Sequence, residues 1–239
     1  MSFKLSVWPQ AAPKVFKPTD YNPILEPILT AQVRPARGLF ITFEGVEGAG
    51  KTTQIKLLKA ALETRSHEVH LTREPGGDAV SETVRHLVLH NEVGARAELL
   101  LFLASRANNV EAVIQPALRD GKTVICDRFI DSSVAYQGCG RRLGRETVVE
   151  FNRFATSDLI PDITFLLDID PLDGLARQKD RNRMESEAIE FHNRVREGFL
   201  TEAENNPIRF RVIDASGTAD DIHEAILSHV VQFIASHGS

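Results

Sequence analysis

The chain has 239 residues, of which 42% are hydrophobic and 26% are charged, and its formal net charge is −5. This balance is typical of a globular protein with a sizeable core; it argues against a disordered chain and against duplex binding as the default. Because the chain has no apolar run of membrane-spanning length, no apolar stretch typical of a secretory signal, and only two cysteines, Cys126 and Cys139, we expect a cytoplasmic protein with free thiols and with neither nucleic-acid nor membrane partners.

Residues 1–37 differ in composition from the rest of the chain. They hold six of the eleven prolines and the only tryptophan, Trp8. Proline removes a backbone donor and blocks helix interiors, so this N-terminal extension is predicted to be extended or irregular. Its apolar side chains leave two interpretations open: an arm that docks on the body or on a partner subunit, and a loose tail.

From Gly38 onward, short apolar runs alternate with longer amphipathic stretches. Strands are predicted at residues 39–43, 69–72, 123–126, 163–167 and 209–213, and helices at 51–64, 97–118 and 220–235. Repeated strand–helix alternation favours a parallel sheet with helices on both faces. We therefore predict one α/β domain over residues 38–239, with a parallel five-stranded sheet.

A glycine-rich motif joins the first predicted strand to the first predicted helix. Residues 45–52 read GVEGAGKT and match G-x-x-x-x-G-K-[ST] in the strand–helix context that this motif requires. Its backbone N–H groups can surround phosphate oxygens, Lys51 can bridge the β- and γ-phosphates, and the Thr52 hydroxyl can ligate Mg²⁺. The predicted ATP-binding residues are Gly45, Val46, Glu47, Gly48, Ala49, Gly50, Lys51, Thr52 and Thr53.

Other classes of phosphate-binding-loop protein fit the sequence poorly. The guanine-reading tetrad N-K-x-D is absent, and D-x-x-G occurs only at residues 214–217, after the last predicted strand. A large ATPase motor would need a much longer chain. A small phosphotransferase remains, with an acceptor held by other residues.

Charged residues follow two of the predicted strands. Arg73 comes after the second strand, and Asp127 and Arg128 come after the third. Strand carboxyl ends converge on the ligand crevice of a parallel sheet, and the arginine fork suits bidentate phosphate contacts. Asp127 is predicted to hold Mg²⁺ together with Thr52, and Asp168 is a rival for that role.

Four segments in order carry a resemblance to a known family. FEGVEGAGKTTQ, TREPGG, FLASR and DRFIDSSVAYQG resemble the corresponding segments of bacterial thymidylate kinases, and the resemblance extends from about Gly38 to the C-terminus. It implies a P-loop kinase fold with a short, arginine-bearing lid. It also implies transfer of the γ-phosphoryl group of ATP to dTMP with Mg²⁺, giving dTDP for dTTP biosynthesis, and a homodimer through the long helices.

The resemblance also implies roles for residues around the base and sugar. Phe102 would stack on thymine, and Arg106, four residues later on the same helix face, would hydrogen-bond the base. Ser133 and Gln137 would flank the edge of the base. Tyr136 would pack beneath the deoxyribose, where a 2′-hydroxyl would clash.

The acceptor phosphate is the second group whose contacts the resemblance implies. Arg73, Arg85 and Arg128 would hold this phosphate, and Glu47 would lie near it and near the 3′-hydroxyl. The complete predicted substrate-binding set is Arg73, Pro75, Arg85, Phe102, Arg106, Arg128, Ser132, Ser133, Tyr136 and Gln137.

A basic cluster at residues 177–185, between two helices, is the predicted lid. Members of this family carry a catalytic arginine either in the P-loop or in the lid, and the P-loop interior here contains none. Arg177 and Arg181 are therefore both candidates. Residues 182–185 are similar to the family's D-R-[IF]-E, with Asn182 in the place of the aspartate. The predicted catalytic residues are Lys51, Arg128, Arg177, Arg181 and Glu47.

Three alternative functions remain at this point. A UMP/CMP-type kinase shares the chemistry, but Tyr136 and the pair of Ser133 and Gln137 argue against it. A deoxynucleoside kinase would not need three arginines directed at an acceptor phosphate. A nucleotide-binding regulator without turnover is disfavoured by the intact set of Lys51, Thr52 and Asp127.

Overall fold

The structure is a computed structural model, and it describes residues 37–177 and 183–237. Of the predicted N-terminal extension, only Arg37 belongs to these ranges. The predicted lid residue Arg181 also lies outside them.

Five parallel strands form one sheet in the order β2-β3-β1-β4-β5. The strands are β1 (Phe40–Glu44), β2 (Val69–Arg73), β3 (Thr123–Asp127), β4 (Ile163–Asp168) and β5 (Phe210–Asp214). The central strand β1 pairs with β3, where Phe43 lies opposite Asp127, and β2 brings Arg73 opposite the same aspartate. The predicted parallel five-stranded sheet is confirmed, and the strand ends differ from the predicted ones by one residue at most.

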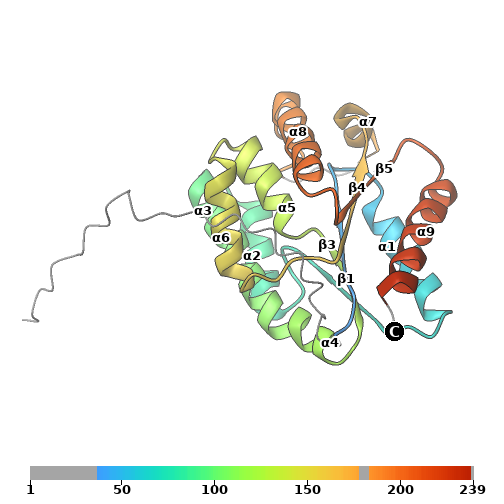
Figure 1. The fold of residues 1–239 in the computed structure, drawn as a ribbon. Helices are drawn as coiled ribbons and strands as arrows, with labels where there is room; N and C mark the ends of the chain where they lie inside the picture. Colours follow the sequence, from blue (N-terminus) through green and yellow to red (C-terminus); the bar gives the residue numbers. More distant parts are fainter. Residues whose placement is uncertain (1–36, 178–182, 238–239) are drawn as a thin grey trace, which may run out of the picture. The chain divides into compact units, whose positions relative to one another are not determined.

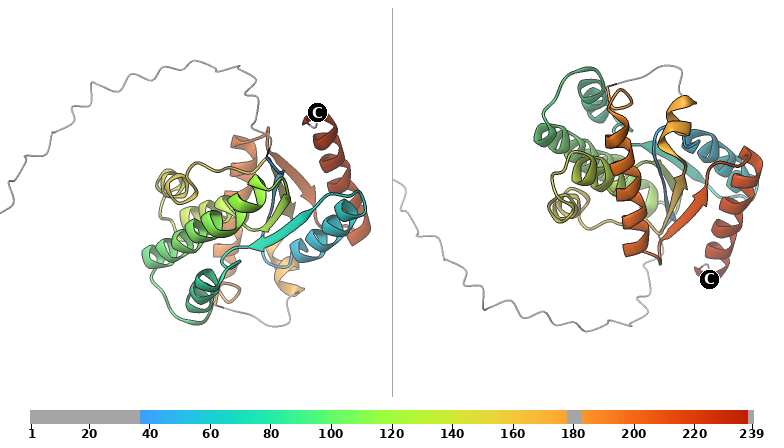
Figure 2. Two further views of the ribbon diagram at one scale, coloured as in Figure 1. Left: turned by 90° about the horizontal axis from the view of Figure 1, so that it is seen from below. Right: turned by 90° about the horizontal axis from the view of Figure 1, so that it is seen from above.

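Helices cover both faces of the sheet (Figure 1). Helices α1 and α9 lie on one side, and α3, α6 and α8 lie on the other, as the two views of Figure 2 also show. The helical segments are α1 (Lys51–Glu63), α2 (Ala79–His90), α3 (Ala95–Asn109), η2 (Val110–Ile114), α4 (Gln115–Arg119), α5 (Ile130–Ser133), η3 (Val134–Gly140), α6 (Arg145–Thr156), α7 (Pro171–Ala176), α8 (Ile189–Asn205) and α9 (Ala219–His237).

Two of these segments are π-helical, and local sequence patterns do not predict them. The expected helix 97–118 is a helical run in which the π-helical segment η2 separates α3 from α4. The second, η3, directly follows α5 and carries Tyr136 and Gln137. Single π-helical turns are frequent at functional sites because the wider turn re-aims side chains.

The core holds the sheet and its helices together around β1. Ile41 and Phe43 of β1 and Phe165 of β4 have no solvent exposure, and Phe43 and Phe165 pack with ring centroids 5.4 Å apart. Leu58 and Leu62 of α1 repeat every four residues, so one face of the helix is buried in this core. The packing fixes the carboxyl ends of the strands at one edge of the sheet, where ligands bind in folds of this type.

No helix in residues 37–177 and 183–237 is long and apolar enough to cross a bilayer. Cys126 is buried and Cys139 is half-buried, and both are free thiols.

Candidate active site

A cleft of about 790 Å³ lies where β1, β2 and β3 end. This volume is in the usual range for a small-molecule site. The cleft brings together predicted residues from distant parts of the chain, namely Glu47, Gly48, Gly50, Lys51, Thr52, Thr53, Arg73, Pro75, Arg85, Phe102, Arg106, Asp127, Arg128, Ser132, Ser133, Tyr136, Gln137 and Arg177.

Three residues of the predicted ATP-binding set do not line this cleft. Val46 and Ala49 are buried in the core, and Gly45 is buried beside them. The side chains of Val46 and Ala49 therefore pack into the core and do not face the cleft. The carbonyl oxygens of Gly45 and Val46 nevertheless point to Lys51, which donates to both.

The glycines of the P-loop are required by its path. Gly48 has φ +73°, and a Cβ there would lie 1.9 Å from the carbonyl oxygen of Gly174. Gly50 has φ +90° and precedes α1 without a side-chain capping bond, and the first turn of α1 contains no acidic residue. The first N–H groups of α1 and the positive end of its dipole are therefore suited to an anion such as a phosphate group.

Lys51 is only 7% exposed at the base of this loop. Its Nζ donates to the carbonyl oxygens of Gly45 and Val46, both at 3.0 Å. Burial, followed by the positive charge of Arg128, lowers the pKa of Lys51 to about 8. A phosphate beside it would compensate the buried positive charge and raise the pKa again.

Another part of the cleft wall is a hydrogen-bonded group that consists of Arg128, Glu47 and Tyr136. The Arg128 guanidinium donates to Glu47 Oε2 at 2.8 Å and to the Gly45 carbonyl at 3.0 Å, and it lies 5.0 Å from the centre of the Tyr136 ring. The Tyr136 hydroxyl donates to Glu47 Oε1 at 2.9 Å. Burial opposes ionisation of Glu47, but Arg128 and then Lys51 outweigh it and lower the pKa of this carboxyl below its usual range.

Arg128 also has an unusual backbone conformation. Its φ is +70°, in the left-handed region that non-glycine residues rarely adopt. Such strain costs on the order of 1–3 kcal/mol and is concentrated at functional sites. The Arg128 N–H donates to the Phe43 carbonyl at 2.9 Å, which ties the strained residue to β1.

The two predicted metal-binding residues are neighbours across the cleft. The Thr52 hydroxyl donates to Asp127 Oδ2 at 3.5 Å. A hydroxyl and a carboxylate oxygen are ligands that suit Mg²⁺. The rival aspartate, Asp168, instead accepts hydrogen bonds from Arg196 at 2.7 and 2.8 Å and does not line the cleft.

Arg73 and Arg85 lie on the wall formed after β2. Arg73 donates to both carboxylate oxygens of Glu82 at 3.0 Å, and Arg85 donates to the Pro75 carbonyl at 2.9 Å. Burial and the neighbouring charge of Arg73 lower the pKa of Arg85. An anion bound between these arginines would relieve their repulsion.

Arg106 is 1% exposed and is held by several protein groups. It donates to Glu74 Oε2 at 2.6 Å, to Ser133 Oγ at 2.8 Å and to the Phe129 carbonyl at 2.9 Å. It also donates to Asn152 Oδ1. These bonds within the described residues use four of the five N–H groups of a guanidinium, so one remains for a ligand.

Several residues that shape this site were missed from the sequence. Glu74 and Asn152 fix Arg106, Glu44 accepts from the Phe129 N–H, and Glu98 contacts Gln137. Glu98 could have been found, because it precedes Phe102 by four residues on the same helix and therefore shares its face. Asn152 gave no such signal, since it lies far along the chain.

Arg177 reaches the cleft from the end of α7. Its guanidinium donates to the carbonyl oxygens of Gly48 and Ala215 at 3.4 and 3.3 Å. Its side chain is exposed, so it can move toward a ligand above the P-loop.

Glu44 is buried at the end of β1 and accepts a hydrogen bond from the Phe129 N–H at 2.8 Å and another from the Ser132 hydroxyl. Burial, with a further contribution from Asp131, raises the pKa of Glu44 from 4.5 to about 7. The folded chain therefore binds more protons than the unfolded chain between these two pH values. The stability that Glu44 contributes is fully present below about pH 4.5 and is lost as the pH rises through 7.

Glu44→Gln is expected to remove this pH dependence. The loss in the wild type is on the order of 3 kcal/mol, because one pKa unit corresponds to about 1.4 kcal/mol. Urea unfolding of both proteins at pH 5 and at pH 8 gives the difference between their free energies of unfolding. Relative to the wild type, the variant should be more stable at pH 8 than at pH 5. An equal difference in the free energy of unfolding at both pH values would contradict the raised pKa of Glu44.

Comparisons with known proteins agree with this geometry. A sequence profile of the family described as thymidylate kinase matches residues 43–226. The thymidylate kinase of Pelobacter propionicus is 46% identical over 207 residues, which cover 82% of this chain and 94% of that protein. The thymidylate kinase of Maridesulfovibrio salexigens is 47% identical over 209 residues, covering 82% and 96%.

A solved structure is also similar to this chain. The crystal structure of thymidylate kinase from Ehrlichia chaffeensis matches with a TM-score of 0.70 and 37% identity, covering 81% of this chain and 98% of that one. The profile match includes the P-loop and all segments that line the cleft. The chain therefore belongs to the thymidylate kinase family.

Proposed function

We propose that the cleft transfers the γ-phosphoryl group of ATP to dTMP with the help of Mg²⁺, giving ADP and dTDP for dTTP synthesis in the cytoplasm. One observation carries this proposal: Lys51 of the P-loop and Phe102 of α3 line the same cleft, with Arg73, Arg85 and Arg128 also in its wall. The cleft can therefore hold a nucleoside triphosphate and a pyrimidine monophosphate together, with arginines for the acceptor phosphate.

The reaction needs no protein nucleophile. An oxygen of the acceptor phosphate attacks the γ-phosphorus in line, the new P–O bond forms, and the bond to the β-phosphate oxygen breaks to release ADP. The protein has to hold two anionic substrates in contact and offset their repulsion. Lys51 and Arg128 are placed for this task, and Arg177 can add positive charge from the α7 side.

The residues present fit a magnesium ion. Thr52 and Asp127 offer oxygen ligands 3.5 Å apart beside Lys51. When bound there, Mg²⁺ would neutralise phosphate charge during transfer. Glu47 serves a different purpose in this proposal, because its salt bridge to Arg128 and its bond to Tyr136 orient both groups toward the sugar and the acceptor phosphate.

Direct product analysis tests the proposed reaction. Incubation of the protein with ATP, dTMP and MgCl₂ should give dTDP and ADP in equal amounts, separated by anion-exchange chromatography. Chelation of the metal with excess EDTA should stop product formation, and added MgCl₂ should restore it. ADP formation without dTDP would contradict the transfer and would favour hydrolysis.

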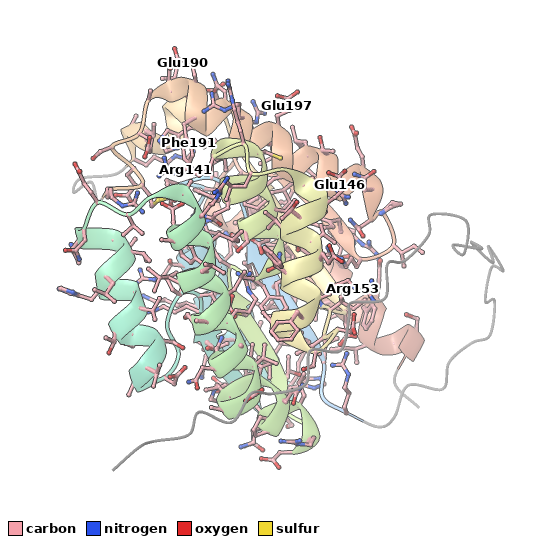
Figure 3. All side chains as sticks on the ribbon, turned by 90° about the vertical axis from the view of Figure 1, so that its left-hand side faces the viewer. Arg141, Glu146, Arg153, Glu190, Phe191 and Glu197 are labelled. Carbon is pink, nitrogen blue, oxygen red and sulfur yellow. The ribbon has the colours of Figure 1, made fainter. Side chains whose placement is uncertain are left out.

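We also propose that the chain forms a homodimer through its long helices. Large apolar side chains are exposed on three helices of one side, including Leu87 on α2, Leu100 on α3, and Phe151 and Phe154 on α6. Figure 3 shows this side of the molecule, where α3 and α6 pack side by side. Exposed apolar side chains gathered in this way are typical of a protein–protein interface.

Leu100→Glu is expected to dissociate this dimer, because Leu100 is 60% exposed on α3 and a charge there would be buried in the interface. Sedimentation velocity of the wild type should show a dimer, and that of the variant a monomer. Ile208→Glu is the matched control, because Ile208 is also a large apolar side chain, 91% exposed, but lies outside these helices. A monomeric wild type at high concentration would refute the dimer.

A further inference from the structure

Glu98 is a buried carboxylate that lies behind the wall of the cleft. It has no solvent exposure and does not itself line the cleft. It accepts hydrogen bonds from Gln137 Nε2 at 2.9 Å and from Arg141 Nε at 3.2 Å through Oε1, and from Arg183 at 2.6 Å through Oε2. The two arginines compensate its charge, which is the condition for a carboxylate to stay ionised inside a protein.

This contact fixes the orientation of the Gln137 side-chain amide. An ionised carboxylate can only accept hydrogen bonds, so Gln137 must turn its NH₂ group and not its oxygen toward Glu98. The nitrogen and the oxygen of the planar amide point in different directions from the amide carbon, so only one of them can face Glu98. Gln137 is 2% exposed and lines the cleft, so its Oε1 is the atom held on the side away from Glu98.

The neighbouring polar groups offer the complementary hydrogen bonds. Ser133 Oγ accepts from Arg106, so its own O–H can be donated to a ligand. The wall beside Phe102 thus presents an acceptor from Gln137 together with donors from Ser133 and Arg106. Uracil and thymine carry an N3–H donor beside an O4 acceptor, whereas cytosine carries an N3 acceptor beside an amino donor.

We propose that Glu98 is a positioning residue that makes the site select a pyrimidine with an N3–H group over cytosine. It acts by holding the Gln137 amide in the single orientation that accepts from N3–H and repels the N3 lone pair of cytosine. This inference rests on the proposed placement of the base beside Phe102 and Gln137. It assigns part of the base selectivity to a residue that does not line the cleft.

The test is the ratio of kcat/KM for dTMP to that for dCMP, measured by coupled ADP release. Glu98→Gln keeps the shape of the side chain but offers both a donor and an acceptor, so the Gln137 amide can bind it in either orientation. The ratio is expected to fall by about tenfold or more, because a site that pairs with one hydrogen-bonding pattern loses its discrimination when that pattern is no longer fixed. The change should appear mainly in KM for the two acceptors, with KM for ATP unchanged.

A matched control separates this role from charge balance. Glu187 lies in the same cluster, with Oε1 2.6 Å from Arg141 Nη1, and this ion pair does not involve Gln137. Glu187→Gln perturbs the cluster by the same chemical change and should leave the dTMP/dCMP ratio unaltered. A similar fall in both variants would show that the cluster's charge matters and would overturn the proposal.

A double-mutant cycle gives a second readout. Gln137→Leu removes the amide, so Glu98→Gln should have no further effect on the ratio in that background. An undiminished effect there would overturn the proposal. If Glu98→Gln does not fold, Glu98→Asp keeps the charge but withdraws the carboxylate by one methylene, and an unchanged ratio in that variant would equally overturn it.

The activity of the wild type shows whether the proposed function or only the role of Glu98 fails. If the wild type does not phosphorylate dTMP, the proposed function fails and this inference fails with it. If the wild type phosphorylates dTMP and the folded Glu98→Gln variant keeps the wild-type ratio, this inference alone fails.

Discussion

Lys51→Ala is expected to lower kcat/KM for phosphoryl transfer by several orders of magnitude. Lys51 is the buried cation at the base of the P-loop, and its Nζ is held by the Gly45 and Val46 carbonyls at 3.0 Å, where it can turn to the β- and γ-phosphates. Removal of a charge proposed to contact the transferred group should raise the barrier directly, because charge shifts between these phosphates in the transition state. Coupled ADP release at varied dTMP and fixed Mg-ATP measures the effect.

Lys59→Ala is the matched control for this change. Lys59 lies on the same helix α1 and pairs with Glu63 on the surface. A surface pair of this kind contributes little, so activity should stay within about twofold of the wild type. Circular dichroism of both variants checks that they fold. Near-wild-type activity of a folded Lys51→Ala protein would remove the P-loop from the mechanism.

Arg128→Ala is expected to have an effect of similar size. Arg128 contacts Glu47 at 2.8 Å and the Gly45 carbonyl at 3.0 Å, so it links the P-loop to the proposed acceptor site. Its loss removes a positive charge from the proposed acceptor site and also leaves the Glu47 carboxylate without its guanidinium partner. Arg128→Lys should recover only part of the activity, because an ammonium group cannot reproduce the planar fork.

Steady-state kinetics of these variants distinguish binding from catalysis. Both KM for dTMP and kcat should change in Arg128→Ala, since the residue is placed to contact the acceptor phosphate before and during transfer. Arg153→Ala is the control, because Arg153 pairs with Asp158 on the exposed side of α6. Equal activity of Arg128→Ala and Arg153→Ala would contradict the proposed acceptor site.

The sheet could be predicted from the sequence because its strands are short, and the three central strands β1, β3 and β4 are almost entirely buried on both faces. The predicted strand at residues 163–167 and the observed strand β4 (Ile163–Asp168) differ by only one residue. The prediction succeeded here because every side chain from Ile163 to Leu167 is buried, and a continuous apolar run marks such a strand. Helix α6 was not predicted, although it packs beside the π-helical segment η3. Local patterns also gave no sign of the π-helical segments, which depend on tertiary packing.

The site was predictable where a local motif carries it and not where distant side chains meet. The P-loop and the arginine after β3 follow from spacing and strand position alone. Asp127 and Asp168 could not be separated from the sequence, because each ends a strand that pairs with β1. The two aspartates differ in the folded chain because Arg196 of α8 donates a hydrogen bond to each carboxylate oxygen of Asp168.

Contacts of the buried carboxylates with residues far away in the chain could likewise not be predicted from local patterns. Glu98 and Gln137 are separated by 39 residues and meet only because α3 packs against η3. Arg106 was predicted to contact the base, and the structure places it in the wall of the cleft with Glu74 and Asn152 as partners. Its role toward the base stays a prediction.

The measurement that tests the central claim most directly is coupled ADP release with Mg-ATP and five acceptors: dTMP, dUMP, UMP, CMP and thymidine. The account predicts the highest kcat/KM with dTMP. Turnover of dUMP should be weaker but detectable, since a methyl group in an apolar pocket is worth only about 1–3 kcal/mol. Negligible turnover of UMP is expected from the position of Tyr136. A preference for UMP or CMP would contradict the base and sugar site, and the absence of turnover with all five would contradict the kinase assignment itself.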